Sequence, residues 1–343
     1  LAMFSGQGRD VKFSIPRVIG YRSFLNKVWN ATRFSLMNIE GSEIKNLSEV
    51  KKSLAVADRY ILSRLHRTIE KVGSSIEDYR FSDGAEALYH FFWDEYCDKY
   101  IEVAKVSFKA DDHAQKSVTG SVLICLLDAS MRLLHPFCPF ISEEIWQSLP
   151  SASWYKENGV EFCAVAPFPV HESELIDKDA EDVIELIFSV STMIKNGRQS
   201  SDLPANLAVP VKLLAKDIPT RDLLLAHLEL ISHLAKTSSI EVVLRGEAEV
   251  SELSVTNSSS AVDTVIMLEG LINVDKELER LRHALEKINK QKASLLARLS
   301  NQTFLQNAPK NIVESQQAEL SALDEKERQL AVARDRLLRV TNS

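Results

Sequence analysis

The run LHPFCPFISEEIW, residues 134–146, marks the point at which one helix must end and another begin. Proline lacks the backbone N–H that a helix interior needs, so Pro136 and Pro139 stop the apolar helix that precedes them. Ser142 is a favoured N-cap residue, and its position predicts the start of the next helix. The aromatic side chains of this run are expected to fill the core: Phe137, Phe140 and Trp146.

Helical spacing of apolar residues continues in both directions from this run. The predicted helices upstream of it cover about 16–38, 58–73, 82–103 and 114–135. Pro16 is a good first-turn residue, and Ser82 or Asp83 is expected to cap the third helix. Because the loops between these helices are short, the sequence predicts an antiparallel helical bundle.

The pattern changes after Pro150. Residues 151–175 are expected to form an irregular connector, followed by a helix at about 180–196. Further on, strands are predicted at Val209–Leu214, Ile240–Leu244 and Val265–Leu268, a helix near 220–235, and a polar serine-rich loop over 251–260. This mixture predicts a small α+β module.

The last segment carries the most regular pattern in the chain. Apolar residues repeat with heptad spacing from Val274 to Leu299, with Lys292 as one polar break in the seam. The spacing resumes between Val313 and Leu337 after a loop that contains Pro309. We therefore expect an antiparallel coiled-coil hairpin, which makes the fold class mostly α.

Composition excludes several classes of protein. With 11 Gly and 10 Pro in 343 residues, the chain is not collagenous or of low complexity. No apolar run reaches the length of about 18 residues that predicts a membrane span. The four cysteines have no CxxC spacing, so we expect free thiols in a reducing compartment and no metal site. The chain begins at Leu1, and we interpret it as a fragment of a longer protein.

Charge is distributed unevenly along the chain. Residues 1–110 carry 17 basic and 14 acidic side chains, residues 111–270 carry 11 and 24, and residues 271–343 carry 13 and 10. Within residues 1–38 the bias is six basic side chains against one acid. Two basic ends around an acidic middle are typical of a protein with two contact regions for one polyanion. Ordinary solvated helix faces are the alternative interpretation.

Motifs for catalysis are absent from the sequence. GxGxxG, GxxxxGK[ST], HExxH and GxSxG do not occur, and the eight histidines are scattered. We therefore predict no catalytic residue and no metal ligand in this chain.

Three runs of the sequence resemble the valyl-tRNA synthetase family. They are GYRSFLNKVWNATRF at 20–34 with QGRD at 7–10, the run at 134–146, and LEGLINVDKE at 268–277 with LSNQTF at 299–304, AP at 308–309 and IVE at 312–314. The third run resembles the arm that is specific to the valyl enzyme. The HIGH and KMSKS signatures and the editing domain of that family do not occur here. The resemblance thus implies tRNA binding by this chain, without aminoacylation.

The resemblance also implies an organisation into parts. They are a remnant of the catalytic-domain junction at 1–11, a helical anticodon-binding domain at 12–150, a connector and small α+β module at 151–268, and a coiled-coil tRNA-binding arm at 269–343. The implied partner is tRNA(Val), with no membrane partner and a monomeric state. No cofactor is implied for this fragment, whereas the parent valine–tRNA ligase would use ATP and Mg²⁺. A cytoplasmic location is expected, with an organellar form as the alternative.

Site residues follow from the same resemblance. The positions that match Lys27 and Phe34 contact the anticodon, and seven residues apart on a helix they share one face. Arg33 is adjacent to them, and Arg17 substitutes for a basic residue that the family has near Pro16. The alternative for Phe34 is a place in the core. The expected tRNA contacts of the arm are Arg280, Lys287, Lys290, Lys292 and Arg298.

Two other functions remain open at the level of the sequence. One is a helical scaffold that binds proteins and dimerises through its coiled coil. The other is a fragment of a leucyl- or isoleucyl-type synthetase, which would share the bundle and lack the arm. The turn between the two heptad runs argues against an intermolecular zipper, because a zipper does not need one.

Overall fold

The computed structural model describes residues 14–110, 112–247, 251, 253–269, 271 and 274–300, and then 320, 321, 323, 324, 327, 328, 330, 331 and 334. The chain divides into two compact units, Leu1–Ser191 with Glu229–Leu234, and Thr192–Leu228 with Ala235–Ser343. Each unit is described by itself below.

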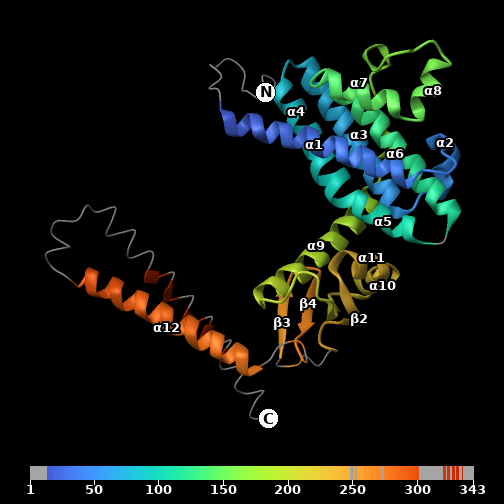
Figure 1. The fold of residues 1–343 in the computed structure, drawn as a ribbon. Helices are drawn as coiled ribbons and strands as arrows, with labels where there is room; N and C mark the ends of the chain where they lie inside the picture. The colour runs from blue at the N-terminus through green and yellow to red at the C-terminus, as the bar shows by residue number, and fades with distance from the viewer. Residues whose placement is uncertain are drawn as a thin grey trace. The chain divides into compact units, whose positions relative to one another are not determined.

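The first unit is a bundle of helices (Figure 1). Its elements are α1 (Ile15–Asn38), α2 (Leu47–Val50), η2 (Lys51–Ser53), α3 (Val56–Glu77), α4 (Phe81–His90), η3 (Phe91–Tyr100), α5 (Ile101–Lys109), α6 (His113–Leu134), α7 (Pro139–Ser148), α8 (Ser151–Lys156), η4 (Cys163–Val165), η5 (Ser173–Leu175), the first part of α9 (Lys178–Ser200) and most of α11 (Leu228–Ala235). The core surrounds α6, which is buried over most of its length and packs against α1, α3, α4, α5 and α7. The prediction of a helical bundle in this part of the chain is therefore confirmed.

Helix α6 is, among the described residues, the one helix that length and composition would allow to cross a membrane. In the structure, 83% of its most apolar window is buried inside the protein. It also carries the buried carboxylate of Asp128, which accepts a hydrogen bond from Trp146 Nε1 at 2.9 Å and pairs with Arg132 at 2.5 Å. These contacts are those of a core helix.

Two expectations for the run at 134–146 were wrong. Helix α7 begins at Pro139 with Cys138 as its N-cap residue, because proline is well suited to the first helical turn. Ser142 lies inside that turn, where its hydroxyl donates to the carbonyl of Cys138 at 2.9 Å. Phe140 is 90% exposed, whereas Trp146 is fully buried. At about 100° per residue these two side chains lie on different sides of the helix.

The third predicted helix is continuous but contains a π-helical segment. It begins at Phe81, ahead of the expected Ser82 or Asp83 cap, and passes through η3 into α5. The wide turns of η3 place Phe91, Phe92 and Tyr96 in the core, each at most 2% exposed. The sequence predicts that the cluster Phe91-Phe92-Trp93, with Tyr96, is part of the core, and this is confirmed for Phe91, Phe92 and Tyr96.

The second unit contains a mixed four-stranded sheet. Its strands are β1 (Val209–Ala215), β2 (Thr237–Leu244), β3 (Ser254–Ser258) and β4 (Val262–Met267), in the order β2-β1-β4-β3. Strands β1 and β2 are parallel, connected through α10 (Ile218–Ala226) and α11 (Leu228–Ala235), and the other pairs are antiparallel. The three expected strands are confirmed. The prediction of a serine-rich loop over 251–260 was wrong, because β3 forms within it. Polar residues can form a strand at the edge of a sheet, where one face is exposed to solvent.

The second half of α9 lies against this sheet. Asn257 Nδ2 donates to the carbonyl of Met193 at 2.8 Å, and a Cβ added at Gly197 would come within 2.7 Å of Ile266 Cδ1. Glycine at this position permits the close approach of helix and strand. Helix α8 (Ser151–Lys156) replaces the start of the expected irregular connector.

Helix α12 (Val274–Leu299) agrees with the first predicted arm helix. Leu285, Ile288 and Leu295 are buried on its seam. The second arm helix expected over 313–337 lies largely outside the described residues, and those described between 320 and 334 are helical.

Candidate nucleic-acid interface

Helix α1 carries all four side chains that were predicted to contact the anticodon. Its buried face consists of Phe24, Val28, Ala31, Thr32 and Ser35. Arg17 and Arg33 are exposed, and Lys27 and Phe34 are half-buried at the border of that face. The helix thus presents these residues along its surface without needing them for its core contacts.

Lys27 is held by groups from the third helix. Its ammonium is 2.6 Å from Asp98 Oδ1 and 3.8 Å from the centre of the Trp93 ring. An ammonium over an indole face is attracted by the ring quadrupole, in addition to the ion pair. The side chain of Lys27 is 25% exposed, so a phosphate or a base edge can compete with Asp98 for its protons.

Trp93 and Tyr89 form an aromatic row beside Lys27. Their rings stack with centroids 5.6 Å apart and planes 18° apart, and Tyr89 also contacts Phe24 at 4.9 Å. Trp93 belongs to the aromatic cluster that is predicted from the sequence to lie in the core. In the structure it is half-buried and faces Lys27. The spacing of four residues between Tyr89 and Trp93 was the signal that could have identified this row.

A cavity of about 480 Å³ lies at the other end of the aromatic row. It is lined by Arg17, Gly20, Tyr21, Ser82, Glu86, Tyr89 and His90. Its size is within the range of small-ligand pockets, and it combines aromatic rings with hydrogen-bonding side chains. Tyr89 lines this cavity together with Arg17 and also stacks on Trp93, which contacts Lys27. The aromatic row therefore extends from the cavity to Lys27.

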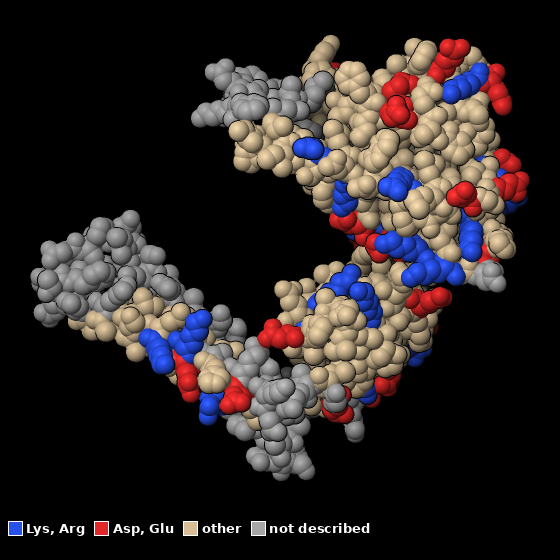
Figure 2. Space-filling model, in the orientation of Figure 1, with Lys and Arg blue, Asp and Glu red and all other residues tan. Residues whose placement is uncertain are grey.

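Phe34 lies farther along α1, and its neighbour is a second cation. Lys105 of α5 places its ammonium 5.7 Å from the centre of the Phe34 ring. Lys105 also pairs with Glu102 at 2.5 Å. Figure 2 shows lysine and arginine side chains along α1 and gathered over α5. Sequence reasoning missed Lys105, because only the packing of α5 beside α1 brings it to Phe34.

Pairing an aromatic face with nearby cations suits single-stranded nucleic acid. An unpaired base can stack on the ring while its phosphate meets the ammonium, and such stacking contributes about 1–3 kcal/mol per base. Phe34 is half-buried, so part of its side chain is accessible, whereas a fully buried core residue exposes none.

The arm residues differ from one another in their surroundings. Lys287 and Lys290 are exposed on α12. Lys292 is half-buried and pairs with Asp324, at 2.5 Å, and with Glu327. These two carboxylates raise the pKa of Lys292 above its usual value. The side chains of Arg280 and Arg298 lie outside the described residues.

Comparison with known proteins identifies two families in the chain. Residues 58–213 match the anticodon-binding domain of tRNA ligases, and residues 273–338 match the valyl tRNA synthetase tRNA binding arm. The second match separates this chain from the leucyl- and isoleucyl-type alternative.

Curated relatives agree with these matches. The chain is 34% identical to the valine–tRNA ligase of Staphylococcus saprophyticus over 95% of its own length and 36% of that protein. It is 36% identical to the enzyme of Geobacillus stearothermophilus, over 92% of its length and 35% of the relative, and 35% identical to that of Thermotoga maritima, over 94% and 35%. The chain therefore spans about a third of the length of these relatives.

Proposed function

We propose, from the premise that this chain carries the anticodon-binding domain and the tRNA-binding arm of the valyl-tRNA synthetase family, that it selects and holds tRNA(Val). The relatives are aminoacyl-tRNA ligases, and the chain covers a non-catalytic part of them. Within the parent protein, valine would be activated with ATP and Mg²⁺ and transferred to the tRNA that this part holds.

The bundle is the proposed reader of the anticodon. The observation that carries this proposal is the placement of Lys27 and Phe34 on one border of α1, each with an accessible side chain and each beside a group from the third helix. Unpaired anticodon bases would stack on Phe34 or enter the cavity beside Arg17. Arg33, exposed next to Phe34, would meet the phosphates between those bases.

The arm is proposed to be an antiparallel hairpin that adds affinity through phosphates. The ion pair between Lys292 and Asp324 supports the fold-back, because it joins two helical residues on either side of the loop. Lys292 then serves as the polar residue of the seam, and we assign tRNA contact first to Lys287 and Lys290. Such contacts would carry little sequence information.

The location and oligomeric state are part of the same proposal. A monomer suits a hairpin whose seam is satisfied within one chain. We propose a cytoplasmic location, which the four free cysteines support because free thiols are typical of a reducing compartment.

Direct binding measurements test the proposal. The full chain should bind a tRNA(Val) transcript more tightly than the same transcript with an altered anticodon. Equal affinity for the two RNAs would refute anticodon reading, because phosphate contacts alone are independent of sequence.

A further inference from the structure

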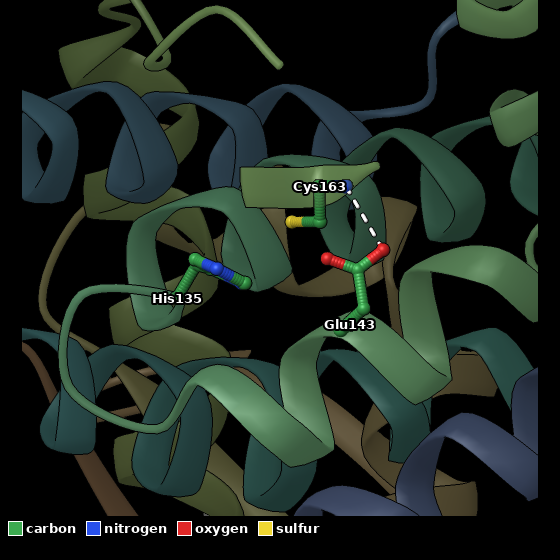
Figure 3. Close-up of side chains that lie close together, drawn as sticks. All are labelled: His135, Glu143 and Cys163. Atoms are coloured by element: carbon green, nitrogen blue, oxygen red, sulfur yellow. Dashed lines mark hydrogen bonds between the residues drawn. The ribbon is translucent and has the colours of Figure 1, made fainter. Parts of the chain in front are cut away.

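Three side chains with different donor atoms converge where the end of α6, the start of α7 and the turn η4 meet. His135 follows the last residue of α6, Glu143 lies on α7, and Cys163 begins the turn η4. One donor atom from each lies within 4.8 Å of the other two. Figure 3 shows the three side chains pointing toward one another from separate segments. Their spacing of 8 and 20 residues matches no sequence motif for metal binding.

We propose that His135, Glu143 and Cys163 bind one Zn²⁺ ion, with a water molecule as the fourth ligand. An imidazole nitrogen, a carboxylate oxygen and a thiolate are the ligands that zinc takes in proteins, whereas Mg²⁺ and Ca²⁺ prefer oxygen alone. The thiolate and the carboxylate together carry two negative charges, which the dication balances. Zinc ligands lie about 2.0–2.3 Å from the ion, so the widest pair of donors must close by about 1 Å.

His135 is already oriented for this role. Its Nδ1 is 2.9 Å from Ser142 Oγ, and that hydroxyl donates its own proton to the carbonyl of Cys138 at 2.9 Å. The hydroxyl oxygen therefore accepts from Nδ1–H, which leaves Nε2 with a lone pair. An outer hydrogen bond of this kind is the usual way in which a ligating histidine is positioned.

Glu143 and Cys163 are brought together by hydrogen bonds of the backbone. Glu143 Oε1 accepts from the N–H of Cys163 at 3.0 Å and from Gln147 Nε2 at 2.8 Å. Its Oε2 accepts only the longer bond from the N–H of Ala164, at 3.3 Å, so this oxygen keeps a lone pair. Cys163 is 3% exposed, while His135 and Glu143 are half-buried and leave a route for an ion.

Bound zinc would crosslink three segments that already contact one another. It would join the end of α6, the first turns of α7 and the turn η4. The established bonds of Glu143 to η4 offer a simpler explanation, in which Glu143 only holds that turn in place. The two explanations differ in whether the thiol and the imidazole take part.

Cobalt titration of the full, reduced chain tests the proposal. Co²⁺ should produce a thiolate-to-cobalt charge-transfer band that saturates at one ion per chain, and Zn²⁺ but not Mg²⁺ should remove it. Cys163→Ala should abolish the band, and Glu143→Gln and His135→Gln should each weaken binding at least about tenfold. Ser142→Ala, which removes only the outer hydrogen bond, should weaken it about 10–100-fold.

Cys138→Ala is the matched control, because Cys138 lies between His135 and Glu143 in the chain and is outside the cluster. It should keep the band. The proposal is overturned if the wild-type chain gives no such band, if Cys163→Ala retains it, or if Glu143→Gln binds as tightly as wild type. Should Cys163→Ala not fold, X-ray absorption of the zinc-loaded wild type decides: one sulfur at about 2.3 Å supports the site, and a shell without sulfur refutes it.

Discussion

Replacing Phe34 by alanine should weaken tRNA binding more than it weakens the fold. Part of the side chain is exposed, so its truncation removes only part of the 1.5–3 kcal/mol that burying a whole phenylalanine contributes, or about 1–2 kcal/mol of stability. Loss of one stacked base costs about 1–3 kcal/mol of binding free energy. The dissociation constant for tRNA(Val) should therefore rise about 5- to 150-fold.

Phe34→Leu separates stacking from packing. Leucine keeps much of the apolar volume of the side chain and should change the free energy of unfolding by less than about 1.5 kcal/mol. It has no aromatic face, so most of the loss of binding should remain. Filter binding or fluorescence anisotropy with the anticodon stem-loop, beside urea unfolding of each variant, supplies the two numbers.

Two further aromatic residues serve as controls. Trp29 is 47% exposed and lies two residues from Lys27, which places it on the opposite side of α1, so Trp29→Ala should leave binding unchanged. Phe92 is 2% exposed, and Phe92→Ala should cost about 3–5 kcal/mol of stability. If Phe34→Ala unfolds the bundle as Phe92→Ala does, Phe34 is a core residue and the reasoning fails.

Three more outcomes are expected. Deleting residues 271–343 should leave the rest of the chain folded and should reduce both the affinity for whole tRNA and the salt dependence of that affinity. The affinity for the anticodon stem-loop should not change. Equal losses of affinity for both RNAs would mean that the arm only supports the bundle. Burial raises the pKa of Glu181, but its bonds from Arg67 and Ser63 outweigh that effect and hold the pKa below its usual 4.5. Stability from this carboxylate is therefore present above pH 4.5 and lost as the pH falls through the lowered pKa, and urea unfolding against pH should show a flatter acid side for Glu181→Gln. Finally, the chain alone should show no valine-dependent pyrophosphate exchange, and exchange above background would reveal an ATP site that its motifs do not contain.

Local features of this protein could be predicted from the sequence because they depend on neighbours along the chain. Apolar spacing located α1, α3, α6 and α12, and short, mostly apolar runs located β1, β2 and β4. The same reasoning placed Lys27 and Phe34 on one helix face, because seven residues make two turns. The sequence predicted that the helix begins at Ser142, whereas α7 begins at Pro139. The apolar pattern alone does not distinguish these two starting points.

Contacts between distant segments were decided by the tertiary structure. Trp93 and Lys105 join Lys27 and Phe34 only because η3 and α5 pack beside α1. Strand β3 forms because it hydrogen-bonds to the edge of β4. Its own polar residues do not predict a strand. His135, Glu143 and Cys163 meet for the same reason. A helix is specified by interactions within four residues, whereas a site depends on which helix faces meet, and that is settled by the packing of the whole core.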